Sequence, residues 1–169
     1  MIEIVKATRD ELQTIHDMAQ VVFRHTYRDI LSPEQMEYMM DMMYSLPNLH
    51  QQLKEGHHYY MACDDGQPCG YVSVQYHEMD GDTKVFHLHK IYVMPECQGK
   101  GVGKILFNQV VEHVQKEKGI SPARIELNVN RYNKAVDFYR HIGMRVLLEE
   151  DFPIGNGFYK TDYIMGLDL

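Results

Sequence analysis

The chain has 169 residues, a length that fits one domain with a hydrophobic core of its own. Hydrophobic residues make up 44% and charged residues 24%, so a disordered or collagen-like chain is excluded. The formal net charge is −7, which argues against a general nucleic-acid binder, because such a protein needs basic side chains to neutralise phosphates.

The first part of the chain predicts one strand followed by a helix. Residues 2–7 alternate between apolar and polar side chains, which is typical of a strand. Thr8 and Glu11 have the spacing of a capping box, in which each side chain bonds the backbone of the other. The apolar stripe that follows, from residue 12 to residue 23, has helical spacing and predicts an amphipathic helix.

Two further helices are expected before the chain changes its period. Ser32 and Pro33 are a start signal, because serine caps a helix and proline fits its first turn. The helix that they open is rich in methionine between residues 36 and 43. Residues 49–54 predict a short third helix, which ends at Gly56.

From residue 58 onward the period is two, as in strands. Residues 59–63 and 70–76 predict a hairpin, and a third strand is expected at 84–93. The later elements are a helix at 102–118, a strand at 124–129, a helix at 133–141, and strands at 144–148 and 158–167. This order predicts antiparallel strands first and a strand-helix-strand crossover in the middle of the chain.

The cysteines and the hydropathy bear on the compartment. No apolar stretch approaches the roughly 18 residues of a membrane span, and the first twelve residues do not resemble a signal peptide. Cys63, Cys69 and Cys97 are an odd number of cysteines, of which the first two could face each other across a turn, and the histidines lack the short paired Cys/His spacing of a zinc site. We therefore expect a cytoplasmic protein with reduced thiols, no metal and no membrane partner, with a disulfide or a zinc site as the alternative.

Residues 98–104 read Gln-Gly-Lys-Gly-Val-Gly-Lys and lie between a predicted strand and the longest predicted helix. Glycines let several backbone N–H groups point at one spot, and the start of a helix adds partial positive charge. The loop therefore predicts an anion site, most naturally for phosphate. A P-loop is excluded because Gln98 and Ile105 stand where it needs Gly and Ser or Thr. A dinucleotide fingerprint needs Gly at Lys104. A plain flexible turn remains the alternative.

Together with the strand at 88–93 and Pro95, this loop resembles the acetyl-CoA motif of the GNAT N-acetyltransferase superfamily. Residues 127–130, 133–135, 138–139 and 142–144 resemble the second conserved block of that family, and the element order matches as well. The pattern is most similar to the bacterial small-molecule and polyamine acetyltransferases. The resemblance implies one α/β domain over residues 1–169. It also implies a mixed, mostly antiparallel sheet of six to seven strands, with helices on both faces and splayed central strands.

The resemblance also implies that acetyl-CoA binds as a co-substrate. Residues 98–104 would hold the pyrophosphate, the backbone at 91–93 would pair with the pantetheine arm, and two asparagines would bind the cofactor or order the next helix. The implied cofactor-binding residues are Ile91, Tyr92, Val93, Gln98, Gly99, Lys100, Gly101, Val102, Gly103, Lys104, Asn130, Asn133 and Tyr139.

Tyr139 matches the usual general acid of the family, since a phenol can protonate a leaving thiolate. Packing beside its neighbour in the core is the alternative. Some members use a glutamate as base eleven residues before the motif glutamine. That position is His87 here, and the ordinary pKa of histidine suits base work at neutral pH. Plain strand histidines, Glu78, Glu126 and a water chain stay open.

The acceptor pocket of the family uses the first two helices and the last hairpin. The implied acceptor residues are Phe23, Tyr27, Tyr38, His89 and Phe158. A polyamine or another small amine is the expected acceptor. A protein amino group, a non-catalytic acyl-CoA-binding module and a histidine-built metalloprotein are the alternatives. The last hairpin is also a candidate surface for a homodimer, and no nucleic-acid partner is expected.

Overall fold

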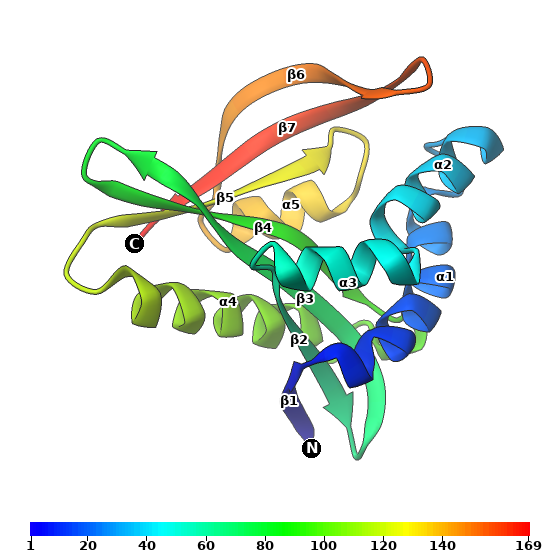
Figure 1. The fold of residues 1–169 in the computed structure, drawn as a ribbon, viewed down its shortest axis with the longest axis horizontal. Coiled ribbons are helices and arrows are strands. Elements are labelled where there is room, and N and C mark those ends of the chain that lie inside the picture. Colours follow the sequence, from blue (N-terminus) through cyan, green and yellow to red (C-terminus); the bar gives the residue numbers. More distant parts are fainter.

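The computed structural model describes residues 1–169, and its centre is one seven-stranded sheet in the order β1-β2-β3-β4-β5-β7-β6 (Figure 1). Neighbouring strands are antiparallel except β4 and β5, which are parallel. The expected mixed, mostly antiparallel sheet is thereby confirmed. The strands are β1 (Ile2–Ala7), β2 (His58–Asp64), β3 (Gln67–Asp80), β4 (Thr83–Val93), β5 (Ala123–Asn130), β6 (Arg145–Gly155) and β7 (Phe158–Asp168).

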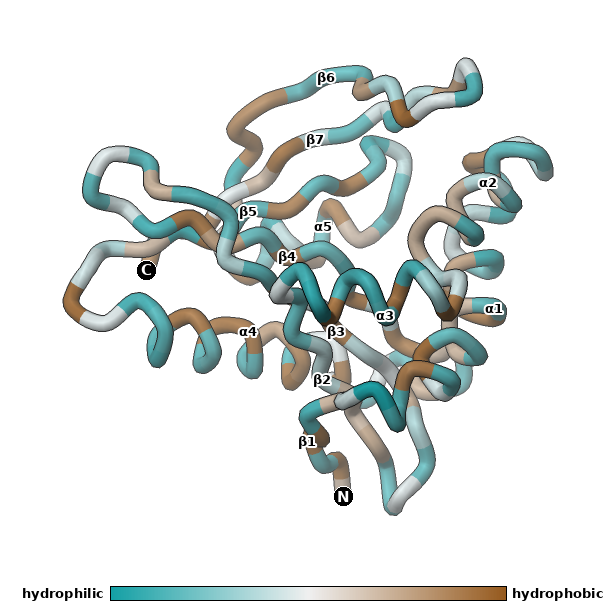
Figure 2. Tube along the Cα trace, viewed as in Figure 1, coloured by the Kyte–Doolittle hydropathy of each residue, from teal (hydrophilic) through white to brown (hydrophobic).

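Helices cover both faces of this sheet, and each face has its own hydrophobic core. One core joins the strands to α4 (Val102–Lys118) and α5 (Ala135–His141). The other joins them to α1 (Leu12–Tyr27), α2 (Pro33–Tyr44) and α3 (Leu46–Lys54). Figure 2 shows hydrophobic and hydrophilic stretches alternating along α4, as expected of a helix with one buried face. None of the helices combines the length and the apolar character needed to cross a bilayer.

Local signals set most of the element boundaries. The capping box of Thr8 and Glu11 is present, and Ser32 caps α2 through the backbone N–H of Gln35. The third helix begins at Leu46, three residues earlier than expected, because Ser45 caps it and a proline occupies its first turn. β6 continues to Gly155, well beyond the predicted end, because it is paired along its length with β7.

The central strands β4 and β5 separate after a short paired stretch. Lys84–His87 of β4 pair with Ala123–Glu126 of β5, and the pairing stops there. Beyond that point β4 stays paired with β3 as far as Val93, and β5 stays paired with β7 as far as Asn130. The two strands therefore diverge, as the expected splay requires (Figure 1).

A bulge in β4 changes which side chains face the helices. Ser73 pairs with Lys90, but the next residue of β3, Val74, pairs with Leu88, so His89 is an extra residue. Leu88 lies in the core on the α4 side, whereas the Lys90 side chain bonds groups of α2 and α3 on the opposite face.

Candidate functional site

A cleft of about 850 Å³ opens where β4 and β5 separate. Its walls are formed by residues 88–93 of β4 and 127–129 of β5. The glycine loop and the start of α4 line one end, and Tyr139 of α5 lines the cleft as well. Of the thirteen residues predicted to bind the cofactor, eleven line this cleft, and Lys100 and Asn130 do not.

The glycine loop has the backbone conformation that an anion site needs. Gly99 and Gly101 have φ angles of 82° and 77°, in the left-handed region that favours glycine. Gly101 caps α4, and Ile105 donates the first intrahelical bond back to its carbonyl. The N–H groups of the first helical turn therefore have no helical partner and are available to a ligand. Lys100 points away and pairs with Asp64 at 3.7 Å.

The edge of β4 that faces the cleft is open. Between Leu88 and Val93 this strand has β3 on one side and no partner on the side of β5. An unpaired strand edge offers backbone N–H and C=O groups that an extended chain can bond like an added strand. The structure thus brings the predicted backbone at 91–93 into the wall of the cleft.

Two asparagines form the turn that carries Tyr139. The Asn130 side chain accepts a hydrogen bond from the backbone N–H of Tyr132 at 2.9 Å, and Asn133 accepts one from Ala135 at 2.9 Å. Both therefore act on the start of α5, one of the two roles predicted for them. Tyr139 is buried, and burial raises the pKa of its hydroxyl above that of an ordinary phenol. It stays protonated at neutral pH.

A second, smaller cavity of about 40 Å³, here called the side pocket, adjoins the cleft and shares Tyr27, His89, Tyr92 and Asn128 with it. One part of its lining is apolar and another part is polar. The apolar residues include Phe23, Leu31, Met39 and Met43, and the further polar ones are Gln35, Asn130, Lys160 and Asp162. An alkyl chain that ends in a polar group would suit this lining.

Beside the side pocket, α2 is tied to the hairpin of β6 and β7. Tyr38 donates from its hydroxyl to the carbonyl of Ile154 at 2.7 Å, and its ring packs against Phe158 with centroids 5.5 Å apart. Gln35 donates to the carbonyl of Tyr159 at 2.8 Å. Of the five predicted acceptor residues, Phe23, Tyr27 and His89 thus line the side pocket, whereas Tyr38 and Phe158 line neither cavity.

Four histidine rings lie in a row, three on β3 and β4 and one, that of His57, directly before β2. The His89 ring stacks on His57 with centroids 4.3 Å apart and lies 4.4 Å from His87, which in turn is 6.2 Å from His77. Burial is the main cause that lowers the pKa of His87 to about 4 and of His89 to about 2. His89 lines both cavities and His87, the predicted base, lines neither, so of the two rings only that of His89 can contact a bound substrate.

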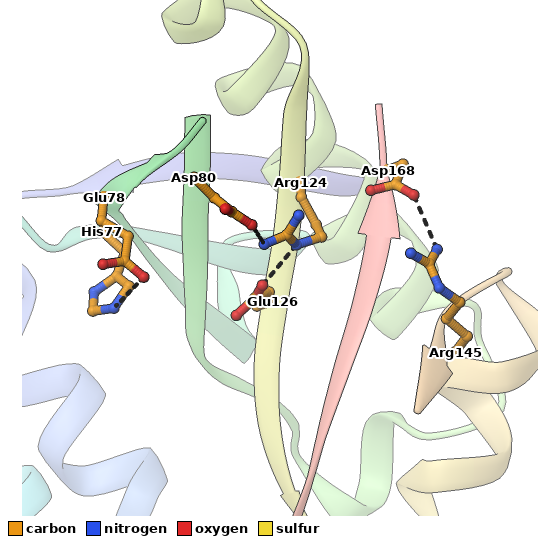
Figure 3. Close-up of polar contacts among 7 residues, drawn as sticks. All are labelled: His77, Glu78, Asp80, Arg124, Glu126, Arg145 and Asp168. Carbon is orange, nitrogen blue, oxygen red and sulfur yellow. Dashed lines mark hydrogen bonds and ion pairs between the residues drawn. The ribbon is translucent and has the colours of Figure 1, made fainter. Parts of the chain in front are cut away.

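The two glutamates left open as bases lie elsewhere (Figure 3). Glu126 accepts a hydrogen bond from Arg124 at 2.6 Å, and that arginine also pairs with Asp80 at 2.9 Å. Glu78 lies 3.7 Å from the ring of His77. Neither glutamate lines the cleft or the side pocket.

Sequence reasoning missed Asn128, Lys160 and Asp162. Asn128 lies two residues before Asn130, so the period of a strand was a usable signal for it. The other two come from β7, whose register beside β5 is not visible in the sequence. No group of three or more His, Cys, Asp or Glu side chains is placed to hold a metal ion. Cys63, Cys69 and Cys97 are free thiols.

Sequence comparison relates the chain to known acetyltransferases. The profile of the acetyltransferase (GNAT) family matches residues 21–144. An uncharacterized N-acetyltransferase of Methanocaldococcus jannaschii is 31% identical over 88 residues, which are 50% of this chain and 38% of that protein. The thialysine N-epsilon-acetyltransferase of Sus scrofa is 38% identical over 65 residues, 38% of this chain and 37% of that protein. The matched part is thus less than two fifths of either relative.

Solved structures agree with this relationship over the full length. The PaiA N-acetyltransferase from Thermoplasma acidophilum, solved in complex with coenzyme A, is similar with a TM-score of 0.75 and 27% identity, covering 100% of this chain and 99% of that one. A GCN5-related N-acetyltransferase from Rhodopseudomonas palustris shares the fold with a TM-score of 0.79 at 17% identity, covering 99% and 95%. With the family profile covering well over half of its length, the chain belongs to the GNAT acetyltransferase family.

Proposed function

We propose that this protein is an acetyl-CoA-dependent N-acetyltransferase that acts on the primary amine of a small aliphatic acceptor. One observation carries the proposal. A single cleft connects the glycine loop, the open edge of β4 and the hydroxyl-bearing residue Tyr139. These are the groups needed to hold a pyrophosphate, an extended pantetheine arm and a leaving thiolate, in that order.

Coenzyme A fits the residues present. The free N–H groups of residues 99–104 would bind the pyrophosphate. The unpaired backbone at 91–93 would bond the pantetheine arm, and a backbone N–H near Ile91 would stabilise the oxyanion that forms on the thioester carbonyl. The similar PaiA structure contains coenzyme A, which supports this assignment.

The reaction needs one proton donor and one proton acceptor. The neutral amine attacks the thioester carbonyl carbon, the C–S bond breaks, and Tyr139 gives its proton to the departing thiolate sulfur. The proton that the nitrogen loses as the amide forms restores the Tyr139 hydroxyl, directly or through water. An aliphatic amine of pKa about 10.4 is almost fully protonated at pH 7 and must first lose a proton. His89 lines both cavities and is neutral at that pH, so its ring can accept a hydrogen bond from the amine; with a pKa of about 2 it passes the proton on to water and does not keep it.

Replacing His89 and His87 one at a time tests which of them assists the loss of the proton from the amine. His89→Gln should lower kcat/KM more than His87→Gln, because only the His89 ring lines the cleft and the side pocket. Since burial lowers the pKa of His89 to about 2, the wild-type profile should show no separate ionisation near 6.5, the ordinary pKa of histidine, and should decline towards low pH only as the free amine becomes scarcer. The measurement is kcat/KM from pH 5 to 9 for both variants. Equal profiles for wild type and His89→Gln would remove this histidine from the role.

The side pocket favours a small acceptor over a protein amino group. It is small, and α2 and the β6–β7 hairpin are tied together beside it. An alkyl chain would lie against methionines, which adapt their shape readily. The name of the Sus scrofa relative identifies thialysine, a flexible aliphatic amine, as that protein's acceptor. A polyamine, expected from the family resemblance, fits the same description.

The proposal is tested by thiol release from acetyl-CoA with a panel of acceptors: spermidine, thialysine, aminoglycosides, amino acids and peptides. We expect acceptor-dependent thiol with a flexible aliphatic amine and little with peptides. Calorimetry with CoA accompanies the assay. Binding of CoA without acceptor-dependent thiol would favour a non-catalytic acyl-CoA-binding module, and no binding of CoA would contradict the proposal altogether.

A further inference from the structure

Asp162 is a buried carboxylate in the wall of the side pocket. Its side chain is 2% exposed, and it is the one carboxylate among the residues that line this pocket. Its polar partners are the ammonium of Lys160 at 3.3 Å and the side-chain amide of Asn128 at 3.4 Å. A buried carboxylate needs such partners, because desolvation penalises an unpaired charge heavily.

The partner lysine is placed differently from the carboxylate. Lys160 lies two residues before Asp162 on β7, near the hairpin tip, and 31% of its side chain is exposed. It also lines the side pocket. Its charge contributes to lowering the pKa of His89, whose ring lines the same pocket. The lysine thus brings a primary alkylammonium from the surface into the pocket.

Asp162 lies at the side of its pocket that is next to the cleft. It lies opposite Asn130 across the β5–β7 pair, at the end of β5 that borders the split in the sheet. Tyr27 and Tyr92 line the side pocket together with Asp162, and they also line the cleft. Their hydroxyl oxygens are hydrogen-bonded at 3.3 Å. Asn133 of the cleft donates to the same Tyr27 hydroxyl at 3.3 Å.

We propose that Asp162 is the ammonium-binding residue of the acceptor site, and that Lys160 occupies it until an incoming alkylammonium takes its place. The proposal rests on the proposed function and names the group that selects cationic acceptors. Exchange of one primary ammonium for another keeps the carboxylate paired throughout, so the penalty for an uncompensated buried charge does not arise. The released lysine already has access to solvent at its hairpin.

A purely structural ion pair makes a different prediction. If the pair only holds β7 in place, removing either partner should weaken acceptor binding in the same direction. If Lys160 competes with the acceptor, the two removals should act in opposite directions. Lys160→Met keeps most of the length of the side chain and removes the charge, and Asp162→Asn keeps the shape of the carboxylate.

The test is calorimetric binding of n-butylammonium chloride, which reproduces the lysine side chain beyond its Cα atom. It is measured for the full chain with and without CoA. We expect Lys160→Met to bind it about tenfold more tightly than wild type, because the competing ammonium is removed. Asp162→Asn should bind it about tenfold more weakly, because one charge-assisted contact is lost. Lys116→Met is the matched control, because that lysine is 75% exposed and pairs with Glu112 far along α4. It should bind like wild type.

Weaker or unchanged binding in Lys160→Met would overturn the proposal. If Asp162→Asn does not fold, the result for Lys160→Met is sufficient to decide. Folding of each variant is checked by its melting temperature and its CoA affinity. Failure of the proposed function is seen separately, as absent CoA binding or absent thiol release in wild type. The butylammonium measurement without CoA still gives a result in that case.

Discussion

Tyr139→Phe is expected to lower kcat by about 100-fold or more, the usual contribution of a positioned general acid. The substitution removes the hydroxyl that would protonate the departing thiolate, and it keeps the ring that packs in the core beneath α5. Affinity for acetyl-CoA should stay within about twofold of wild type, because backbone groups carry most of the cofactor contacts. Steady-state rates and calorimetry with CoA measure the two effects.

Tyr76→Phe is the control for this substitution. Tyr76 is 47% exposed on β3 and lines neither cavity, so its kcat should equal that of wild type. If Tyr139→Phe turns over as fast as the control, the hydroxyl has no part in the reaction and the residue is core packing, the other interpretation that its position allows.

The second large effect concerns stability. Lys90 is buried, and its ammonium donates to the carbonyl of Met43 at 2.8 Å, to Gln52 at 2.9 Å and to the hydroxyl of Tyr59 at 2.6 Å. It also lies 4.3 Å from the ring centroid of Tyr44. These contacts favour the charged form, but burial outweighs them and lowers the pKa to about 7.

The contribution of Lys90 to the free energy of unfolding should therefore rise as pH increases from 7 towards 10, against an opposite contribution from buried tyrosines and from Cys69, whose pKa values burial raises. In this range the unfolded chain keeps the lysine protonated, with a pKa near 10.5, while the folded chain has lost that proton. The state that binds more protons is destabilised as pH rises, which here is the unfolded state. At about 1.4 kcal/mol per unit of pKa difference, the gain is on the order of 2–4 kcal/mol.

Lys90→Met should lose most of this rise. The measurement is urea unfolding at pH 7, 8, 9 and 10 for wild type, Lys90→Met and the exposed-lysine control Lys116→Met. The control should follow wild type at every pH. If Lys90→Met showed the same slope as wild type, the buried ammonium would keep an ordinary pKa, and its three oxygen contacts would be the dominant influence.

Much of the fold follows from short-range signals in the sequence. The helix expected at 102–118 has those bounds in the structure, because a glycine stands directly before and after it. The capping box at Thr8 is equally local. The signals at Ser45 and the proline that follows it were of the same kind, and overlooking them placed the start of α3 three residues late.

The residues of the candidate site likewise fall into those that local motifs predict and those that only the strand pairing brings in. Tyr139 and the glycine loop lie in compact motifs, and the chain carries them into one cleft. Asp162 and Lys160 belong to the site only because β7 lies beside β5, in a register fixed by pairing over a separation of more than 30 residues. The preference for His89 over His87 depends on the three-dimensional course of the cavities, which alternation along one strand does not reveal.

The bulge at His89 gives β4 two halves that are out of phase. With strict alternation, the side chain that follows Phe86 and Leu88 towards α4 would be that of Lys90, and a cation would enter an apolar core. The added residue instead sends the lysine to the helices of the other face and Ile91 to the core. A deletion of one residue from this strand would exchange the two sides, so the length of β4 between its pairing with β5 and the glycine loop cannot drift in evolution without a compensating change.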